Sequence, residues 1–489
     1  MKEIVIIGGG LGGLTSGAML AKDGYKVTLL EQHTLAGGCA TTFKRKGGFK
    51  CEVGLHEMDG VYSSKAVKKV FEYLKVYDHI TFVKPEEFYR HKSHTLDFIM
   101  PNKKEIAIEK LKASYPHEAE GIDKYFALIK KLHNQIERIQ EASWWEFALF
   151  PFIFFPLLRY RKTSLKKIME NLFQDEELKL LLNTNVQYYH NNIAELNILF
   201  HAVAQHSFFE GGGYFIKGGS QRLSDYFVSI IEEYGGRVIL GANVTAIGKE
   251  TNRATTVSYL DKKGLKHILN ADIVISNLSP AQTYKMSDVV YEEKMDISTS
   301  LLTVYVGFNK NLKSIYGNRA YTTFLFKDIN TIDDYDNDNS SLEHRAFVFT
   351  DYSQLDSGLT PEGKSFGVFC SVDSLEEWRE LDKKSYKQKK DVIAKAYVET
   401  LSKEYPDIEK YIEFIEVGTA KTMKRYLKTP NGTAYGFAPT IKQFFRIPKT
   451  KSNKLKNLYF VGAWVIGGGF SAAIISANMC YSMITKNKK

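Results

Sequence analysis

The chain has 489 residues, of which 44% are hydrophobic and 25% are charged, and its formal net charge is +10. This length exceeds that of one ordinary domain, so we expect two or three domains with the composition of a globular protein. The lysines are scattered without a recognisable nucleic-acid-binding module, so DNA and RNA are not expected as partners.

The first residues predict a nucleotide-binding turn between a strand and a helix. Ile4–Ile7 are typical of a buried parallel strand, and Leu14–Lys22 predict a helix. Between them, Gly8, Gly10 and Gly13 match G-x-G-x-x-G. The first glycine makes the turn, the second lets the backbone approach a pyrophosphate, and the third lets helix and strand pack closely. The free N–H groups at the start of this helix would face the phosphates.

The next stretch, YKVTLLEQ, predicts a second buried strand that ends at Glu31. A carboxylate here would accept hydrogen bonds from a ribose 2′-hydroxyl and repel a 2′-phosphate. Gly37 and Gly38 follow, and GGFKCEVGLH then alternates like a strand up to Gly54. An NAD-binding dehydrogenase would continue with a crossover helix. A glycine-rich loop that leads into a hairpin instead resembles flavoproteins of the glutathione-reductase type, in which FAD lies extended under such a loop.

A long apolar stretch, ASWWEFALFPFIFFPLLRYRKTSLKK, interrupts the middle of the chain. Its residues Phe147–Leu158 carry no charged or polar side chain, and two tryptophans precede them. Basic residues follow, namely Arg159, Arg161, Lys162, Lys166 and Lys167. Segment 144–162 therefore lies in a lipid headgroup region, lines an apolar tunnel, or belongs to the core. The first two alternatives imply a water-insoluble substrate. The net charge fits an anionic membrane surface or plain solvation.

The region around residues 218–247 predicts a return to the nucleotide-binding part. Ser220 is a good N-cap, and Gly235 and Gly236 end the helix that follows. Its apolar face consists of Leu223, Phe227, Ile230 and Ile231. RVILGANVTAI and HILNADIVISNLSP then supply strands.

The C-terminal region repeats the strand, glycine turn and helix pattern. Leu458–Val461 predict a buried strand, Gly467–Gly469 a turn, and the residues from about Phe470 a long helix rich in small residues. Two such turns at opposite ends of the chain imply one cofactor domain assembled from both. The sequence holds no second G-x-G-x-x-G with a ribose acid, so an NAD(P)H site is not expected.

These motifs resemble the phytoene desaturase, carotenoid isomerase and retinol saturase superfamily of FAD enzymes over essentially the whole chain. Its carriers are IVIIGGGLGGLTSGAMLAKDGYKVTLLEQ, GGGYFIKGGSQRLSDYFVSIIEEYGGRVILGANVTAI, ADIVISNLSP, TPNGTAYGF and NLYFVGAWVIGGGFSAA. Relatives carry a basic residue shortly before the Gly-Gly pair, whereas this chain has QHTLAGG. The contacts that this basic side chain makes therefore cannot be transferred.

The resemblance implies an α/β fold: a Rossmann-like FAD-binding domain of the glutathione-reductase type with an inserted α+β substrate domain. We expect the FAD-binding domain in residues 1–61, 206–289 and 421–489, and the substrate domain in residues 62–205 and 290–420. The residues expected to bind FAD are Gly8, Gly10, Leu11, Gly12, Gly13, Glu31, Gln32, Gly37, Gly38, Gly54, Val244, Asn277, Gly462 and Gly469.

A flavin moves a hydride without a protein nucleophile, so the protein must position a carbon chain and manage a proton at the neighbouring carbon. His56 and Glu57 follow the Gly54 turn, which the family places near the flavin. GLHEMDG is similar to a histidine-bearing stretch of retinol saturase-like members. Tyr426 and Tyr435, which flank LKTPNGTA, are the other candidate catalytic residues.

We therefore expect an FAD-dependent oxidoreductase that saturates or desaturates an apolar polyene or isoprenoid lipid, with an external electron donor or acceptor. The alternatives are a redox-neutral carotenoid cis/trans isomerase, an amine-oxidase-like flavoenzyme, and a non-catalytic FAD-containing lipid-binding protein. The apolar run Phe147–Leu158 argues against a small polar amine as the substrate.

The four cysteines, Cys39, Cys51, Cys370 and Cys480, show no C-x-x-C pairing and no metal-ligand spacing. This pattern favours a reducing compartment, and we expect no metal site. A first strand at Ile4 leaves no room for a signal peptide, and no apolar run is long enough to span a bilayer. We expect a cytoplasmic protein, free or peripheral on the inner face of the membrane.

Overall fold

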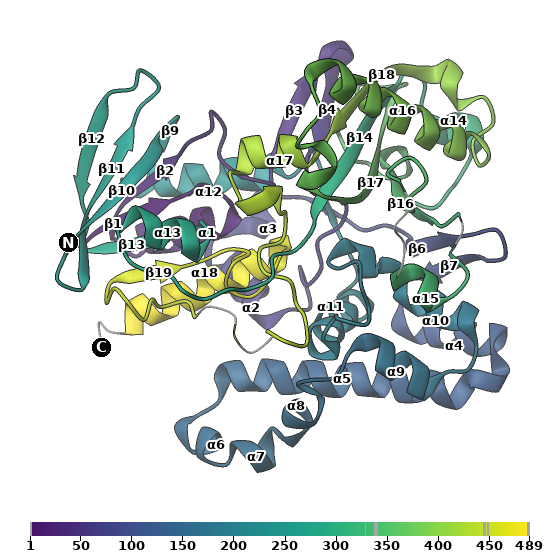
Figure 1. The fold of residues 1–489 in the computed structure, drawn as a ribbon, viewed down its shortest axis with the longest axis horizontal. Helices are drawn as coiled ribbons and strands as arrows, with labels where there is room; N and C mark the ends of the chain where they lie inside the picture. The colour runs from purple at the N-terminus through teal and green to yellow at the C-terminus, as the bar shows by residue number, and fades with distance from the viewer. Residues whose placement is uncertain (1, 328, 337–340, 444–445, 447–448, 487–489) are drawn as a thin grey trace.

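The computed structural model describes residues 2–327, 329–336, 341–443, 446 and 449–486. A parallel sheet lies near both chain ends, a seven-stranded sheet lies beside it, and a layer of helices lies below the larger sheet in Figure 1.

The smaller of these two sheets is parallel throughout and collects strands from distant parts of the chain. Its strands are, in spatial order, β19 (Leu458–Phe460), β13 (Ile273–Ser276), β1 (Glu3–Ile7), β2 (Lys26–Glu31) and β9 (Arg237–Leu240). One face is covered by the helices α1 (Leu11–Lys22), α12 (Gln221–Glu233) and α18 (Phe470–Thr485). The other face is covered by an antiparallel sheet of β10 (Asn243–Glu250), β11 (Arg253–Leu260) and β12 (Lys266–Asn270).

The sequence of strand β1 is apolar without a break from Ile4 to Ile7, and its burial explains why. Successive side chains of a strand point to opposite faces. Ile4 and Ile6 pack with the helices, whereas Val5 and Ile7 pack with the antiparallel sheet. All four side chains are at most 2% exposed. Burial on both faces therefore requires an apolar residue at every position.

The larger sheet is mixed, because β6 and β15 pair in parallel while all other neighbours are antiparallel. Its strands are, in spatial order, β18 (Ile412–Gly418), β14 (Ser300–Phe308), β17 (Ser365–Asp373), β16 (Phe347–Asp351), β15 (Thr322–Leu325), β6 (Glu87–Lys92) and β7 (Asp97–Pro101). Helix α16 (Lys383–Ser402) packs on one face. The other face borders the parallel-sheet region and the helical layer.

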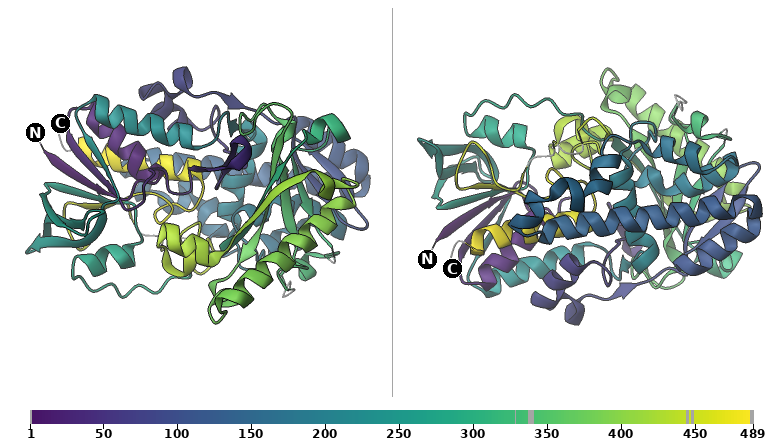
Figure 2. Two further views of the ribbon diagram at one scale, coloured as in Figure 1. Left: turned by 90° about the horizontal axis from the view of Figure 1, so that it is seen from above. Right: turned by 90° about the horizontal axis from the view of Figure 1, so that it is seen from below.

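The helical layer is built around α5 (Ala119–Glu141). The right panel of Figure 2 views the molecule from below, and α5 crosses the middle of that view. The other members of the layer are α4 (Lys104–Ser114), α6 (Trp144–Ala148), α7 (Phe150–Ile153), α8 (Phe155–Tyr160), α9 (Leu165–Leu172), α10 (Glu176–Asn183) and α11 (Ile198–Gly211). The remaining elements are β3 (Thr42–Arg45), β4 (Phe49–Glu52), α2 (Lys65–Tyr73), α3 (Val76–His79), β5 (Phe82–Val83), β8 (Phe215–Ile216), α13 (Pro280–Met286), α14 (Leu312–Tyr316), α15 (Ile332–Asp336) and α17 (Ala420–Leu427).

The strand and helix predictions near both glycine turns are confirmed by β1, α1, β2, β19 and α18. Ser220 is the N-cap residue of α12, as predicted, but its side chain makes no capping hydrogen bond. Its hydroxyl donates instead to Glu52 Oε1 at 2.6 Å, because the β3–β4 hairpin places this buried carboxylate beside the helix start. The five strands of the parallel sheet all fall within residues 1–61, 206–289 and 421–489. The domain boundaries themselves stay a prediction.

The apolar segment 144–162 folds into the short helices α6, α7 and α8. Phe154 and Leu157 are buried, whereas Phe152 is 82% exposed. Assignment of the whole segment to the core is therefore wrong. In the part of the chain that the structure describes, no helix has the length and apolarity needed to cross a membrane.

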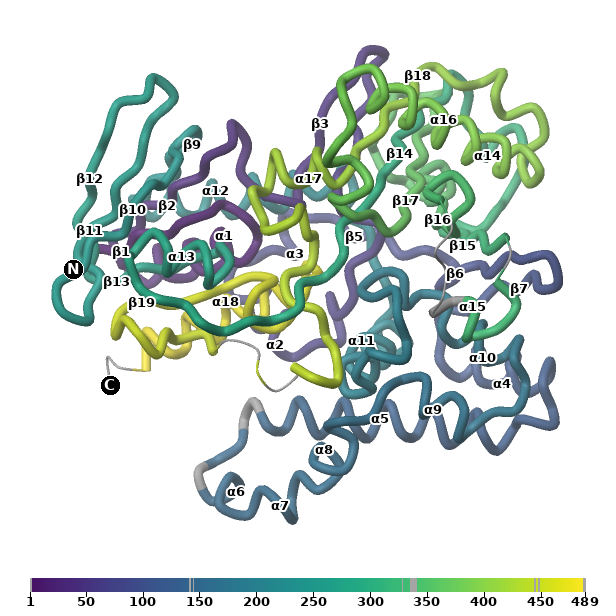
Figure 3. The backbone as a smooth tube through the Cα atoms, in the orientation of Figure 1, coloured from purple at the N-terminus to yellow at the C-terminus, as the bar shows by residue number. Residues whose placement is uncertain are grey.

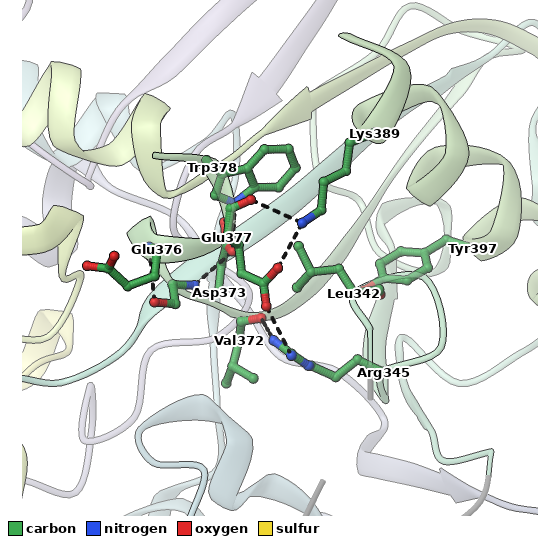
Figure 4. Close-up of polar contacts among 10 residues, drawn as sticks. Leu342, Arg345, Val372, Asp373, Glu376, Glu377, Trp378, Lys389 and Tyr397 are labelled. Atoms are coloured by element: carbon green, nitrogen blue, oxygen red, sulfur yellow. Dashed lines mark hydrogen bonds and ion pairs between the residues drawn. The ribbon is translucent and has the colours of Figure 1, made fainter. Parts of the chain in front are cut away.

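A buried carboxylate ties the end of β17 to α17, the helix that leads toward the candidate site. Asp373 accepts hydrogen bonds from Trp378 Nε1 at 2.8 Å and from the Ala420 backbone N–H at 2.7 Å (Figure 4 shows the side chains around Asp373). Lys389 bonds Glu377 beside it at 2.7 Å. Burial raises the pKa of Asp373, and the hydrogen bonds from Trp378 and Ala420 oppose that shift.

We expect Asp373→Ala to destabilise the protein by about 2–4 kcal/mol, since it strands two buried donors. The exposed neighbour variant Glu376→Ala should change stability by less than about 0.5 kcal/mol. Thermal unfolding of both variants checks this. Equal midpoints for the two variants would contradict the anchoring role of Asp373.

Candidate functional site

A cavity lies at the carboxyl ends of β1, β2 and β13, the edge at which open parallel sheets bind ligands. Further wall comes from the Gly37–Gly38 loop, the start of β10, β14, α17 and the start of α18. Most of the predicted cofactor-binding residues line it, namely Gly8, Gly10, Leu11, Gly12, Glu31, Gln32, Gly37, Gly38, Gly54, Val244, Asn277, Gly462 and Gly469.

The first glycine turn is packed too closely for side chains. A Cβ atom on Gly10 would lie 2.6 Å from the Asn277 side-chain amide, and one on Gly12 would lie 2.6 Å from the backbone nitrogen of Gly462. Gly13 lies behind the cavity wall, where a Cβ atom would lie 2.2 Å from the Gly8 carbonyl oxygen. Gly13 therefore closes the contact between helix and strand, and the other glycines leave backbone facing the cavity.

Glu31 is held at the cavity wall by two backbone N–H groups. Its Oε2 accepts from Gly9 and its Oε1 accepts from His33, each at 2.7 Å. Each carboxylate oxygen has a second lone-pair direction, so the group can still accept hydrogen bonds from a ribose. Gln32 donates to the Tyr426 carbonyl at 3.3 Å, which brings the end of α17 over this side of the cavity.

The C-terminal turn completes the opposite wall. Gly462, at φ +83°, donates its N–H to Ser476 Oγ at 2.7 Å, and Gly469 is the N-cap of α18. The Asn277 amide links the two turns, since in its satisfied orientation it donates to Val461 and accepts from Gly10. The N-termini of α1 and α18 thus both face the cavity, which suits anionic and carbonyl-bearing ligand groups.

Sequence reasoning missed Lys428. Its Nζ donates to Asn243 Oδ1 at 3.1 Å, and both residues line the cavity. Among the described lining residues, Lys428 is the one basic side chain. It lies just beyond the α17 end that contacts Gln32, so it brings positive charge to the region where QHTLAGG lacks a basic residue. Nothing local distinguishes this lysine from the other 65 lysines and arginines.

His56 and Glu57 lie just beyond the cavity wall. In their segment of the chain, Gly54 is the last residue that lines the cavity. His56 Nδ1 lies 3.0 Å from Thr350 Oγ1, and burial lowers its pKa to about 4, so the ring is neutral near pH 7. Burial, followed by the charge of Glu87, raises the pKa of Glu57 well above its usual value, and Lys84 opposes the shift. Burial therefore favours the neutral acid form of Glu57.

Tyr188 is a second residue that the sequence did not reveal. Its ring stacks on His56 with the centroids 6.4 Å apart. Within the described residues, neither the Tyr188 hydroxyl nor Glu57 Oε1 has a hydrogen-bond partner, although both atoms are buried. Thr322 Oγ1, directly across the sheet from Thr350, has none either. We name Glu57, Tyr188, Thr322 and His56 the polar chamber.

The two C-terminal tyrosines lie in different places. Tyr435 lines the cavity and packs so tightly on Gly468 that a Cβ atom there would lie 2.2 Å from the ring. Its hydroxyl is one of the groups that raise the pKa of Tyr188, so the cavity and the polar chamber are neighbours. Tyr426 is 49% exposed at the rim and contacts His33 beside Glu31. A catalytic role for Tyr426 is therefore not supported.

The sequence profile of the family described as "Flavin containing amine oxidoreductase" matches residues 11–479. The chain belongs to this family. It is 26% identical to the all-trans-retinol 13,14-reductase of Danio rerio, covering 99% of this chain and 86% of that one. It is 24% identical to the chloroplastic prolycopene isomerase of Daucus carota, covering 98% and 79%. The fold is similar to that of a Methanosarcina mazei oxidoreductase, with a TM-score of 0.64, 16% identity and full coverage of both chains.

The flavoenzyme family and the cavity together identify the cofactor as FAD. The glycine turn leaves no room for side chains, the helix N-termini of α1 and α18 suit phosphates and ring carbonyls, and Glu31 suits a ribose. The described residues contain no group of three or more His, Cys, Asp or Glu side chains arranged to hold a metal ion.

We expect Gly10→Val to yield colourless protein, because its Cβ would displace the Asn277 amide and its methyl groups would fill the wall. Gly264→Asn, in a remote hairpin with open space around its Cβ and a positive φ that asparagine tolerates, should bind FAD like the unaltered protein. The visible absorbance of the purified proteins checks both outcomes. A yellow, fully flavinylated Gly10→Val protein would show that this turn does not contact the cofactor.

Proposed function

We propose that this protein is an FAD-dependent oxidoreductase that acts on a C=C or C–C bond of an apolar polyene lipid. The carrying observation is a group of uncharged polar side chains beside the FAD cavity, packed against aromatic rings such as Phe208 and Phe324. Alignments over nearly the whole chain with a retinol reductase and a prolycopene isomerase support the same substrate class.

For the cofactor we propose the extended binding mode of the glutathione-reductase type. Glu31 would hold the adenosine ribose, with Lys428 and Val244 beside this half. The start of α1 would hold the pyrophosphate. The flavin ring would lie near Gly469, Thr303 and Tyr435, which wall the cavity next to the polar chamber.

Bound FAD supplies hydride transfer to or from a carbon atom of the substrate. Reduction of a C=C bond also needs a proton for the second carbon. Burial favours the neutral acid form of Glu57 and the protonated hydroxyl of Tyr188, so these two side chains are the candidate proton donors. A desaturase would need a proton acceptor instead. The neutral His56 imidazole is such an acceptor, so the groups of the polar chamber serve either direction. We propose reduction, with electrons from an external donor, because the chain aligns with a retinol reductase over nearly its whole length.

Anaerobic mixing tests the proposed function. Protein reduced with dithionite is mixed with all-trans-retinol or with a carotenoid, oxidised protein is mixed with putrescine, and flavin absorbance and products are followed. Reoxidation by a polyene with a saturated product supports the proposal. Isomerised polyene without net reoxidation indicates an isomerase. Turnover of putrescine by oxidised enzyme indicates an amine oxidase. Indifference to every compound indicates a binding protein, and each of these last three outcomes contradicts the proposal.

We expect Glu57→Gln and Tyr188→Phe each to slow polyene reduction by about 10²–10³-fold, since each removes a proton source. Both variants should bind FAD normally, because neither residue lines the cavity. Tyr234→Phe, at an exposed tyrosine outside the cavity, is the matched control and should keep full activity. Product analysis and flavin content measure these effects. Equal rates for Tyr188→Phe and the unaltered protein would exclude its hydroxyl from the reaction.

The reaction should also depend on pH in one direction. Glu57 donates only in its neutral form, which is present below its raised pKa and is lost as the pH rises through that pKa. The rate of polyene reduction should therefore fall on the alkaline side. In Glu57→Gln this alkaline fall should disappear from the pH profile. A fall that persists in the variant would assign it to another group.

A further inference from the structure

The helices α6, α7 and α8 carry a compact group of exposed apolar side chains. Within eleven residues, the exposed fractions are 49% for Trp145, 51% for Phe147, 47% for Leu149, 82% for Phe152 and 57% for Phe155. Figures 1 and 3 show these helices at the lower extremity of the molecule, beyond α5. We call these five residues the apolar tip. Such a dense cluster marks an interaction surface, since single exposed apolar residues are the norm elsewhere.

The apolar tip is fixed to the protein rather than loosely attached. Phe154 and Leu157 are buried on the inner side of the same helices, in the core cluster of α5, α9 and α11. The Arg138 guanidinium of α5 lies over the Phe154 ring. Glu146, at the start of α6, bonds Arg138 at 2.9 Å and closes a capping box with Ser143. These contacts hold the exposed rings outward without burying them.

The chain next to the apolar tip is strongly basic. Arg159, Arg161, Lys162 and Lys167 are exposed, whereas residues 147–169 contain no acidic residue. Of the two acids that flank this stretch, Glu146 is paired with Arg138, and Glu170 lies at the end remote from the apolar tip. Apolar rings next to a stretch of basic residues without acidic ones complement a layer of acyl chains beneath anionic headgroups.

The apolar tip also connects to the candidate site through packed helices. Helix α8 packs against α11. On α11, Phe200 contacts Gly467 in the turn before α18, and Phe208 stacks on Tyr188 of the polar chamber with centroids 6.4 Å apart. A single helix thus joins the anchored side of the apolar tip to both the FAD cavity wall and the polar chamber.

We propose that the apolar tip and its basic flank dock on an anionic lipid bilayer, with the rings in the interfacial region and the basic side chains on the headgroup phosphates. The membrane contact follows from the exposed surface alone. That it supplies the polyene substrate along α11 rests on the proposed function.

Vesicle co-sedimentation tests the docking. The variant Trp145→Ser/Phe152→Ser/Phe155→Ser should bind vesicles of phosphatidylcholine and phosphatidylglycerol at least about tenfold more weakly than the unaltered protein. The control variant Leu265→Ser/Ile268→Ser/Val290→Ser alters three exposed apolar side chains elsewhere and should bind normally.

The basic residues are tested separately. The variant Arg159→Gln/Arg161→Gln/Lys162→Gln should lose the preference for anionic over pure phosphatidylcholine vesicles. FAD content and thermal midpoint establish that each variant is folded, and Phe152→Ser alone replaces the triple variant if that variant does not fold.

Three outcomes would overturn the docking: no vesicle binding by the unaltered protein, equal loss in the control variant, or a dimer that the tip variant converts to a monomer. The last outcome would assign the surface to a second copy of the chain.

Substrate supply is tested with polyene in vesicles and in detergent micelles. The tip variant should be slower only with vesicles. If the unaltered protein converts no polyene in either form, the proposed function fails while vesicle binding still decides the docking.

Discussion

The candidate site depends on how closely three strand ends approach one another. The turns after β1 and β19 meet across Asn277, which follows β13, and a Cβ atom on Gly12 or Gly462 would lie within 2.6 Å of the opposing segment. No side chain larger than hydrogen fits there. The resulting bare backbone, with two helix N-termini behind it, provides N–H groups where a dinucleotide carries phosphates and carbonyls. The same packing that closes the parallel sheet therefore creates the cofactor site.

The two sides of the cavity have different electrostatic characters. At the Glu31 side, a buried carboxylate and the exposed Lys428 side chain line the cavity and suit the polar adenosine half of FAD. Beyond Tyr435, burial removes charge: the His56 imidazole loses its proton and the Glu57 carboxyl keeps it. Desolvation favours the neutral form of every group in this chamber. A water-insoluble polyene and a store of transferable protons need the same dry surroundings, so one environment serves both.

The sequence predicted the parts of the fold that depend on local patterns. Glycine spacing and apolar runs located β1, α1, β19 and α18, because a buried parallel strand and the following helix leave a continuous signature. Ser220 has the residue type of a cap, yet its hydroxyl bonds Glu52, which lies 168 residues earlier. Long-range packing overrides a local preference in such cases. No sequence window contains both partners.

The side chains of the candidate site were harder to predict for the same reason. Tyr188 stands in a short helical turn with nothing unusual around it, and its role arises from His56 and Thr322. Tyr426 and Tyr435 are nine residues apart, yet one lies at the rim and the other at the inner wall, because the chain turns sharply at Lys428 and Asn431 with positive φ. Sequence proximity therefore said little about shared function.

The arrangement of the parallel sheet has a consequence for biosynthesis. Strand β19 and helix α18 follow every other element in chain order, yet they form the wall opposite the Gly8–Gly13 turn. A nascent chain that still lacks them has an open sheet edge and half a nucleotide cradle. Flavin loading must therefore wait until translation has passed residue 469, and until then the apolar edge at β13 needs protection from a chaperone or from its own neighbouring segments.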